Sequence, residues 1–165
     1  MKALFPVLAA VALCAAPHAA LAADAAPAAK PKSGAPGSVE RGRYLARTAG
    51  CNDCHTPGYA QSGGTVPEKL WLTGDQLGWS GPWGTTYPSN LRLALARMSE
   101  KEWLASARSR QLRPPMPWFA LRDMSDDDLR AIYRYVKHLG PAGDAAPGFV
   151  PPGKAPNGPA IKFPG

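Results

Sequence analysis

The pentapeptide Cys51-Asn52-Asp53-Cys54-His55 carries the most informative pattern in this chain of 165 residues. Two cysteines separated by two residues and followed directly by histidine form the attachment pattern for c-type haem. On one turn of helix, both thiols can reach the vinyl groups of a single porphyrin and form thioethers. The adjacent imidazole then lies under the iron, where neutral histidine is a common axial ligand. The pattern therefore predicts one covalent haem c, tethered by Cys51 and Cys54 and ligated by His55.

Two other kinds of site use the same cysteine spacing. A zinc site needs further ligands, but after residue 22 the chain has only these two cysteines, and the other histidine there, His138, is far along the chain. A thioredoxin-like dithiol is expected next to a strand–helix–strand pattern, and no such pattern surrounds the motif. Haem attachment is therefore the favoured interpretation.

Residues 1–22 have the three parts of a secretory signal peptide. Lys2 gives a positive start, residues 4–13 are almost wholly apolar, and Ala20-Leu21-Ala22 is a small-x-small cleavage site. The apolar run is too short for a membrane-spanning helix, so we expect cleavage near Ala22, a periplasmic protein and no stable membrane anchor. Export fits the maturation of c-type haem proteins, which takes place outside the bacterial cytoplasm. Residues 23–37 are predicted to be a disordered linker, because they contain almost no group able to form a core.

Helical periodicity marks three segments of the remaining chain. Ser38 is a candidate N-cap for a helix that ends at Gly50. Ser99 begins a capping box, in which a glutamate follows three residues later. The last helix follows Ser125, starts with acidic residues and stops at Gly140. Between them, 17 glycines and 19 prolines indicate long loops and little sheet.

Two segments lack helical periodicity. Residues 70–91 hold three tryptophans among many glycines, and we expect an irregular loop whose aromatic rings lie against the haem. Residues 142–165 are rich in proline and glycine. This tail is either free or lies along the domain through Phe149, Ile161 and Phe163. The folded part is then roughly 105 residues, enough to bury one modest core.

The order of these features resembles class I cytochrome c. An amphipathic helix with an early glycine, Gly42, precedes the cysteine motif, Met116 follows in a proline-rich loop, and a final helix carries Tyr133 and Tyr135. The resemblance covers about residues 38–140 and implies a cytochrome c domain at residues 38–141 with an all-α fold, in which a few helices and long loops wrap around one haem. In that family the glycine lets the first helix cross the last one against an aromatic residue, a role open to either tyrosine.

The resemblance also implies the remaining ligands. In class I cytochromes c the distal iron ligand is a methionine in such a loop, which assigns Met116; Met98 and Met124 are the competitors and fit core positions better. A backbone carbonyl, often from proline, accepts the other N–H of the proximal histidine. The candidate for that carbonyl is Pro67, twelve residues after His55.

The run 82–91 is similar to a stretch in the cytochrome subunits of periplasmic alcohol and aldehyde dehydrogenases. Trp83, Tyr87 and Asn90 belong to this run and are predicted to contact the haem, with Trp N–H and Thr or Asn side-chain groups meeting its propionates. Those subunits usually carry several haem domains. The single motif in this chain therefore suggests a single-domain relative of such subunits.

No pattern of general acid, base or nucleophile appears, which favours a single-electron carrier without bond chemistry of its own. The expected partners are redox proteins: a dehydrogenase as donor, and an oxidase or reductase as acceptor. One alternative is a cytochrome subunit permanently bound to a dehydrogenase. Another is a haem peroxidase or gas sensor with an open distal site.

Charge adds a prediction about docking. The formal net charge is +7, and residues 92–113 are the most basic region. Such a run is either a solvated face or a patch that docks an acidic partner surface. The run leads directly into the Met116 loop, so we expect it to lie near the haem. Nucleic acid is not an expected partner, because the protein is exported.

Overall fold

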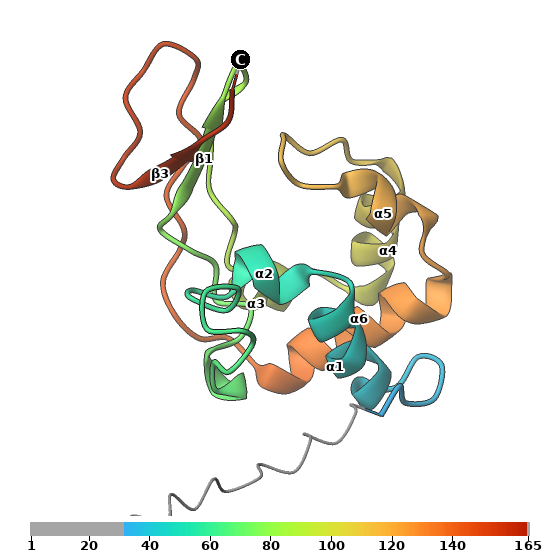
Figure 1. Cartoon of the computed structure of the whole chain (residues 1–165). Helices are drawn as coiled ribbons and strands as arrows, with labels where there is room; N and C mark the ends of the chain where they lie inside the picture. Colours follow the sequence, from blue (N-terminus) through green and yellow to red (C-terminus); the bar gives the residue numbers. More distant parts are fainter. Residues whose placement is uncertain (1–31, 165) are drawn as a thin grey trace, which may run out of the picture. The chain divides into compact units, whose positions relative to one another are not determined.

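The computed structural model describes residues 32–164, so the predicted signal peptide lies outside the described residues. Its α-helices are α1 (Val39–Thr48), α2 (Cys51–His55), α3 (Leu91–Ala96), α4 (Glu100–Ser109), α5 (Trp118–Asp123) and α6 (Asp126–Leu139) (Figure 1). The other elements are the 3-10 helix η1 (Glu68–Leu70) and the strands β1 (Gly78–Gly81), β2 (Gly84–Thr86) and β3 (Ala160–Lys162). None of the helices described between residues 32 and 164 has the length and apolar character needed to cross a bilayer.

Helix α1 crosses α6 in close contact, with Gly42 at the crossing (Figure 1). A Cβ atom on Gly42 would lie 2.5 Å from Cβ of Tyr135 and closer still to the carbonyl oxygen of Ala131. The predicted pairing of glycine and aromatic residue is therefore confirmed, and the aromatic residue is Tyr135. The side chain of Tyr135 is fully buried, and its hydroxyl donates a hydrogen bond to Glu68. Tyr133 instead donates to the carbonyl of Met98.

The three predicted helix starts are confirmed by side-chain caps. Oγ of Ser38 accepts a hydrogen bond from the backbone N–H of Arg41, and Oγ of Ser125 accepts one from Asp128. Ser99 forms a complete capping box with Glu102. Each cap satisfies a backbone donor that the first turn of a helix leaves without a partner.

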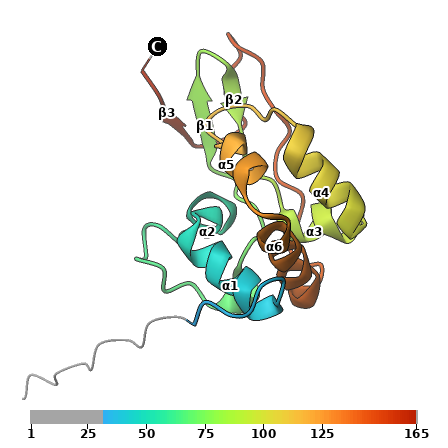
Figure 2. The same cartoon turned by 90° about the vertical axis from the view of Figure 1, so that its right-hand side faces the viewer.

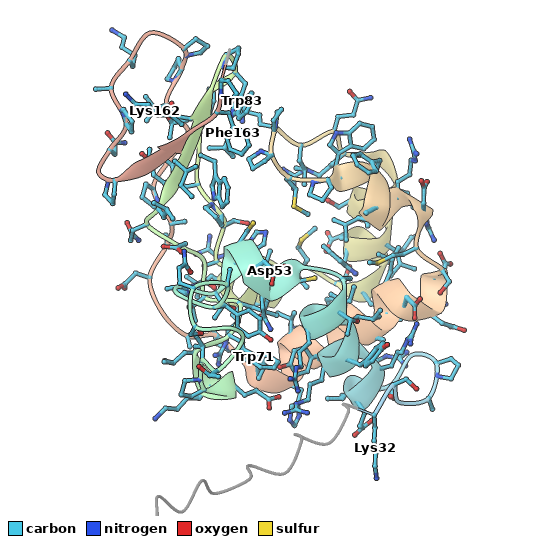
Figure 3. The ribbon with its side chains drawn as sticks, in the orientation of Figure 1. Lys32, Asp53, Trp71, Trp83, Lys162 and Phe163 are labelled. Carbon is cyan, nitrogen blue, oxygen red and sulfur yellow. The ribbon has the colours of Figure 1, made fainter. Side chains whose placement is uncertain are left out.

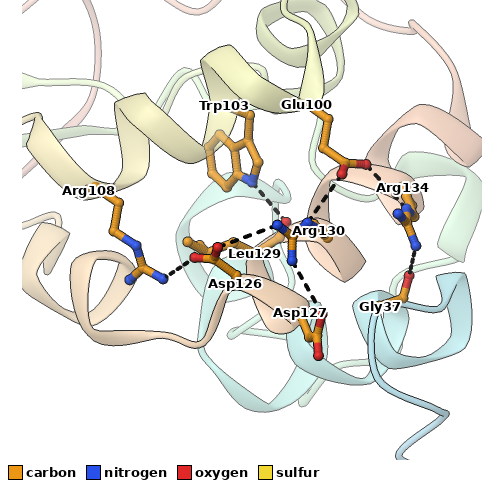
Figure 4. A network of polar contacts seen from close by, with 9 residues as sticks. All are labelled: Gly37, Glu100, Trp103, Arg108, Asp126, Asp127, Leu129, Arg130 and Arg134. Atoms are coloured by element: carbon orange, nitrogen blue, oxygen red, sulfur yellow. Dashed lines mark hydrogen bonds and ion pairs between the residues drawn. The ribbon is translucent and has the colours of Figure 1, made fainter.

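A polar network joins α4 to the first turns of α6 (Figure 4). Nε1 of Trp103 donates to the carbonyl of Leu129 at 2.8 Å, inside the interface. At the surface of the same interface, Glu100 forms ion pairs with Arg130 and Arg134. The buried bond fixes the position of α4 on α6, and the surface pairs neutralise charges on both helices.

Replacing Asp128 by asparagine is expected to lower the free energy of unfolding at pH 7 by about 1 kcal/mol. Asp128 and Arg41 are 2.8 Å apart, only about a quarter exposed, and join α6 to α1. Arg41 lowers the pKa of Asp128. A lowered folded pKa stabilises the protein above the unfolded pKa of about 3.9. This contribution is lost as the pH falls through the lowered folded value.

Urea unfolding at pH 7 and at successively lower pH measures this effect. The difference between Asp128→Asn and the unmodified protein should shrink as the pH falls. Asp127→Asn is the matched control, because Asp127 is more exposed and pairs more loosely with Arg130. Equal losses for the two variants at pH 7 would contradict a specific role for the Arg41 pair.

Residues 32–37, the described part of the predicted linker 23–37, make hydrogen bonds that the prediction of disorder did not include. A turn closes through the bond from the backbone N–H of Ser38 to the carbonyl of Ala35. Nη1 of Arg134 donates to the carbonyl of Gly37 at 2.9 Å. A polar segment without core residues is thus ordered by a bond from α6, which local composition does not reveal.

The expected irregular loop at residues 70–91 contains a β-hairpin, so that prediction is wrong. Strands β1 and β2 pair antiparallel with Trp79 opposite Thr86. Strand β3 pairs parallel with β1 on the other side, giving the order β2-β1-β3 (Figure 1). The partner strand lies near the C-terminus of the chain, so no local pattern could indicate this sheet. The mostly helical class I fold is confirmed, with the small sheet as an addition.

The C-terminal segment lies along the domain, which is the second of the two predicted courses. The side-chain amide of Asn90 donates to the carbonyls of Ala142 and Asp144. The backbone of Val150 then pairs with Thr85 at the free edge of β2. These bonds, followed by β3, attach residues 142–163 to the hairpin.

Candidate functional site

The cysteine motif forms its own short helix, α2, directly after α1. Gly50 has a φ of +77°, a left-handed conformation that suits glycine, and it turns the chain from α1 into α2. Residues three and four apart share one face of a helix. Cys54 and His55 are therefore on the same face of α2 as Cys51, as covalent attachment of one porphyrin requires.

His55 is held in one orientation by a backbone carbonyl. Its Nδ1 lies 2.7 Å from the carbonyl oxygen of Ser89. A carbonyl only accepts hydrogen bonds, so Nδ1 carries the proton and Nε2 keeps its lone pair. Burial lowers the pKa of His55 and favours the neutral imidazole. The side chain is thus a pre-oriented ligand with one nitrogen free for a metal.

The prediction that Pro67 supplies this carbonyl is wrong. The carbonyl of Pro67 accepts from the backbone N–H of Leu70 and closes the turn of η1. Ser89 takes the role instead, because the chain returns past α2 between β2 and α3. The bond joins residues 34 positions apart, and no sequence pattern marks Ser89 for it.

Neither thiol of the motif has the lowered pKa that is typical of a redox dithiol. Burial raises the pKa of Cys51 to about 11. Burial also raises the pKa of Cys54, together with the neighbouring charges of Asp53 and Asp75. Reactive dithiols need a lowered pKa, because the thiolate is the nucleophile. Neutral thiols at the required spacing beside an oriented imidazole instead fit covalent haem.

The donor set also fits haem better than a bare metal ion. Within residues 32–164, no group of three or more His, Cys, Asp or Glu side chains is placed to hold a metal ion. A porphyrin brings four nitrogen ligands of its own, so the protein needs to add only the axial ligands.

Two buried polar residues, which the sequence analysis did not predict, connect α2 to the loop that follows it. Oγ1 of Thr56 donates to Oδ1 of Asn52 at 2.8 Å and accepts from the backbone N–H of Leu72 at 2.8 Å. The carbonyl of His55 accepts from the backbone N–H of Gly74. Both Asn52 and Thr56 are buried. They connect the motif to the following loop and hold His55 in place.

Met116 lies outside the packed core. It is half-buried in the turn between α4 and α5, where its N–H bonds to the carbonyl of Arg113 and its own carbonyl accepts from Trp118. Met124 packs against the hydrophobic core, as expected of a core methionine. Met98 ends the turn after α3, and its carbonyl accepts from Tyr133.

The other predicted haem contacts have structural roles in the tail and hairpin. Nε1 of Trp83 donates to the carbonyl of Trp79 at 3.3 Å, and the hydroxyl of Tyr87 accepts from the N–H of Asn157. Oδ1 of Asn90 caps α3, and its amide group holds the tail. The side chain of Asn90 thus bonds to three backbone groups of the protein.

The basic run 92–113 divides into two groups. Arg92 is buried and donates to the carbonyls of Lys69, Leu139 and Gly140, which places its charge at the C-terminal end of α6. Arg108 pairs with Asp126. Four exposed side chains of the run have no ion-pair partner within the part of the chain that the structure describes. They are Arg97, Lys101, Arg110 and Arg113.

Comparison with known proteins gives one family and one relative. The model of the family described as Cytochrome c matches residues 39–140. A nicotinate dehydrogenase subunit from Pseudomonas putida is 29% identical over 121 residues. The match covers 66% of this chain and 9% of that protein, so the chain spans less than a tenth of its relative. No solved structure gives a significant match.

Proposed function

The chain belongs to the cytochrome c family, and we propose that it is a periplasmic carrier of single electrons with one haem c, axially ligated by His55 and Met116. Bound haem supplies the redox couple. The observation that carries this proposal is the orientation of His55. Its Nδ1–H donates to Ser89 and leaves Nε2 free, on the same turn as the two thiols.

Each residue of the site has a defined task in this proposal. Cys51 and Cys54 tether the porphyrin, and the carbonyl of Ser89 raises the basicity of His55 as an iron ligand. The thioether of Met116 closes the sixth position, which favours electron transfer over the binding of small molecules. Residues 1–22 act as the export signal and are removed near Ala22.

A second candidate function is supported by the relative. That protein is named as a subunit of a nicotinate dehydrogenase, and this chain is similar to a short part of it. The corresponding proposal is a cytochrome subunit that receives electrons within a dehydrogenase complex. Native purification separates the two: a subunit co-elutes with a large dehydrogenase, and a free carrier elutes alone at its own mass.

The isolated protein, expressed with periplasmic haem maturation, provides the test of haem attachment. We expect an intact mass equal to a chain starting near Ala23 plus one haem. We also expect resistance to acid-acetone extraction and a ferric near-infrared sulfur-to-iron band. Carbon monoxide should bind poorly. An unmodified chain would refute haem attachment, and rapid CO binding would instead indicate a peroxidase or sensor with an open site.

Electron transfer to the partner is expected to slow as salt rises. The mature chain keeps a formal charge of +6, because Lys2 is the only charged residue in 1–22. Exposed basic residues steer encounter with an acidic surface, and screening acts over roughly 10 Å at 0.1 M salt. Arg110→Glu should lower the association rate several-fold at low salt, measured by stopped-flow absorbance.

Lys32→Glu is the matched control for Arg110→Glu, since it makes the same change of charge. Figure 3 shows Lys32 at the α1 end of the domain, away from the turn that joins α4 and α5. Lys32→Glu should therefore leave the association rate nearly unchanged. Rates that do not vary with salt, or equal effects of the two variants, would show the basic run to be an ordinary solvated face.

A further inference from the structure

One face of the small sheet is aromatic. Trp79 is paired with Thr86 on β2 and with Ile161 on β3, so the side chains of all three stand on one face. Phe163, two residues after Ile161, continues this face. Its ring centroid lies 5.8 Å from that of Trp79 and 5.5 Å from that of Trp83. We call this set of five side chains the aromatic face.

The C-terminal segment passes over the opposite face of the sheet. It pairs through Val150 with the free edge of β2 and then reaches the far edge of β1 as strand β3. Between these points, the backbone N–H of Asn157 donates to the hydroxyl of Tyr87. Tyr87 directly follows Thr86, and successive side chains of an extended segment point to opposite faces, so Tyr87 stands on the face opposite Thr86. The tail therefore leaves the aromatic face uncovered, and Phe163 is 37% exposed.

The aromatic face is turned toward α5. Figure 3 shows Trp83 and Phe163 together on one side of the sheet, with Lys162 on the other side. Figure 1, in the same orientation, shows helix α5 on that side of the sheet, and in Figure 2, seen from that side, α5 is drawn in front of the β1–β2 hairpin. Met116 lies two residues before α5. The proposed iron ligand and the aromatic face thus approach the same region from opposite sides.

The aromatic face is also close in sequence to the residue that orients His55, the proposed proximal ligand. Thr86 ends β2, and Ser89, which holds His55, follows three residues later. Three extended residues span at most about 10 Å. Thr86 therefore lies within about that distance of the carbonyl that orients the iron ligand.

Thr86 carries a polar atom that the chain itself does not satisfy. Its Oγ1 is buried and has no hydrogen-bond partner within residues 32–164. A buried hydroxyl without a partner is destabilising, and native proteins rarely keep one without a reason. An acceptor on a ligand next to the aromatic face would satisfy this donor.

We propose that the aromatic face is a wall of the haem pocket, to which the C-terminal segment contributes Phe163 directly after β3, and that Thr86 donates to a haem propionate. The inference rests on the proposed haem site at α2. Phe163 lies beyond residue 140, where the match to the family model ends. The tail thereby becomes part of the cofactor environment.

The wall should tune the redox couple by excluding water. Ferric haem carries one more positive charge than ferrous haem, and a drier, less polar surrounding disfavours the additional charge. Covering the haem edge with Phe163 therefore raises the midpoint potential. A hydrogen bond from Thr86 stabilises the propionate as a carboxylate and keeps its pKa low.

The test uses the full-length haem-loaded protein and measures its midpoint potential by spectroelectrochemistry across pH. Phe163→Ala should shift the potential to lower values, and Phe163→Leu should restore most of the shift. Thr86→Val, which replaces the hydroxyl by a methyl group of similar size, should move the pH-dependent part of the potential to higher pH. Lys162→Ala, on the opposite face of the same strand, should change neither quantity.

Two results would overturn the inference. In the first, Phe163→Ala and Thr86→Val retain covalent haem and the potential–pH curve of the unmodified protein. In the second, Phe163→Ala weakens binding to a dehydrogenase partner without changing the potential, which would make the aromatic face a protein-docking surface. If Phe163→Ala fails to fold, the midpoint potentials of Thr86→Val and Phe163→Leu still test the inference. Absence of haem from the unmodified protein would refute the proposed function itself.

Discussion

Replacing Met116 by alanine is expected to leave the covalent haem in place and to open the sixth position of the iron. The ferric sulfur-to-iron band should disappear, and carbon monoxide should bind readily to the reduced protein. The midpoint potential should fall by on the order of 100 mV, because the axial ligands set haem potentials over a range of about 0.8 V. Absorbance spectra, CO titration and redox titration measure these three changes.

Met124→Ala is the matched control for Met116→Ala. Met124 packs against the core, so its truncation should cost about 2 kcal/mol of stability and preserve the band. Met98→Ala should also preserve it. A band that survives in Met116→Ala, or disappears in Met98→Ala, would move the sixth ligand to another residue.

Replacing Gly42 by alanine is expected to lower the free energy of unfolding by about 3 kcal/mol. The added Cβ would collide with the carbonyl of Ala131 and with Cβ of Tyr135. Both are held in α6, and neither is the flexible end of a side chain. Relief therefore requires α1 to move away from α6 and opens the core around Tyr135. Chemical denaturation of the haem-loaded protein, followed by circular dichroism, measures the loss.

Gly148→Ala provides the control for this prediction. An added Cβ at Gly148 meets no atom within 4 Å, and its φ lies outside the left-handed region. Its stability should remain within about 0.5 kcal/mol of the unmodified protein. A loss below about 1 kcal/mol for Gly42→Ala would show that α1 can shift on α6 at little cost.

Local patterns were sufficient to predict the parts of the protein that depend on near neighbours. The spacing of Cys51, Cys54 and His55 works within one turn of helix, and the structure confirms that turn. Caps at Ser38, Ser99 and Ser125 bond to backbone groups three residues away, so short sequence patterns identify them. The small-residue requirement at Gly42 was predicted from its position in a family pattern.

The remaining features depend on contacts between distant residues, and only the tertiary structure decided them. Ser89 displaces Pro67 as the partner of His55 because the chain returns past α2 after β2. Strand β1 pairs with a strand close to the C-terminus, and that pairing turned a predicted loop into a sheet. Arg92 belongs to a basic run in sequence, yet its charge is buried against the end of α6. Such outcomes depend on backbone groups without partners and on surfaces that meet only after folding, which no local pattern records.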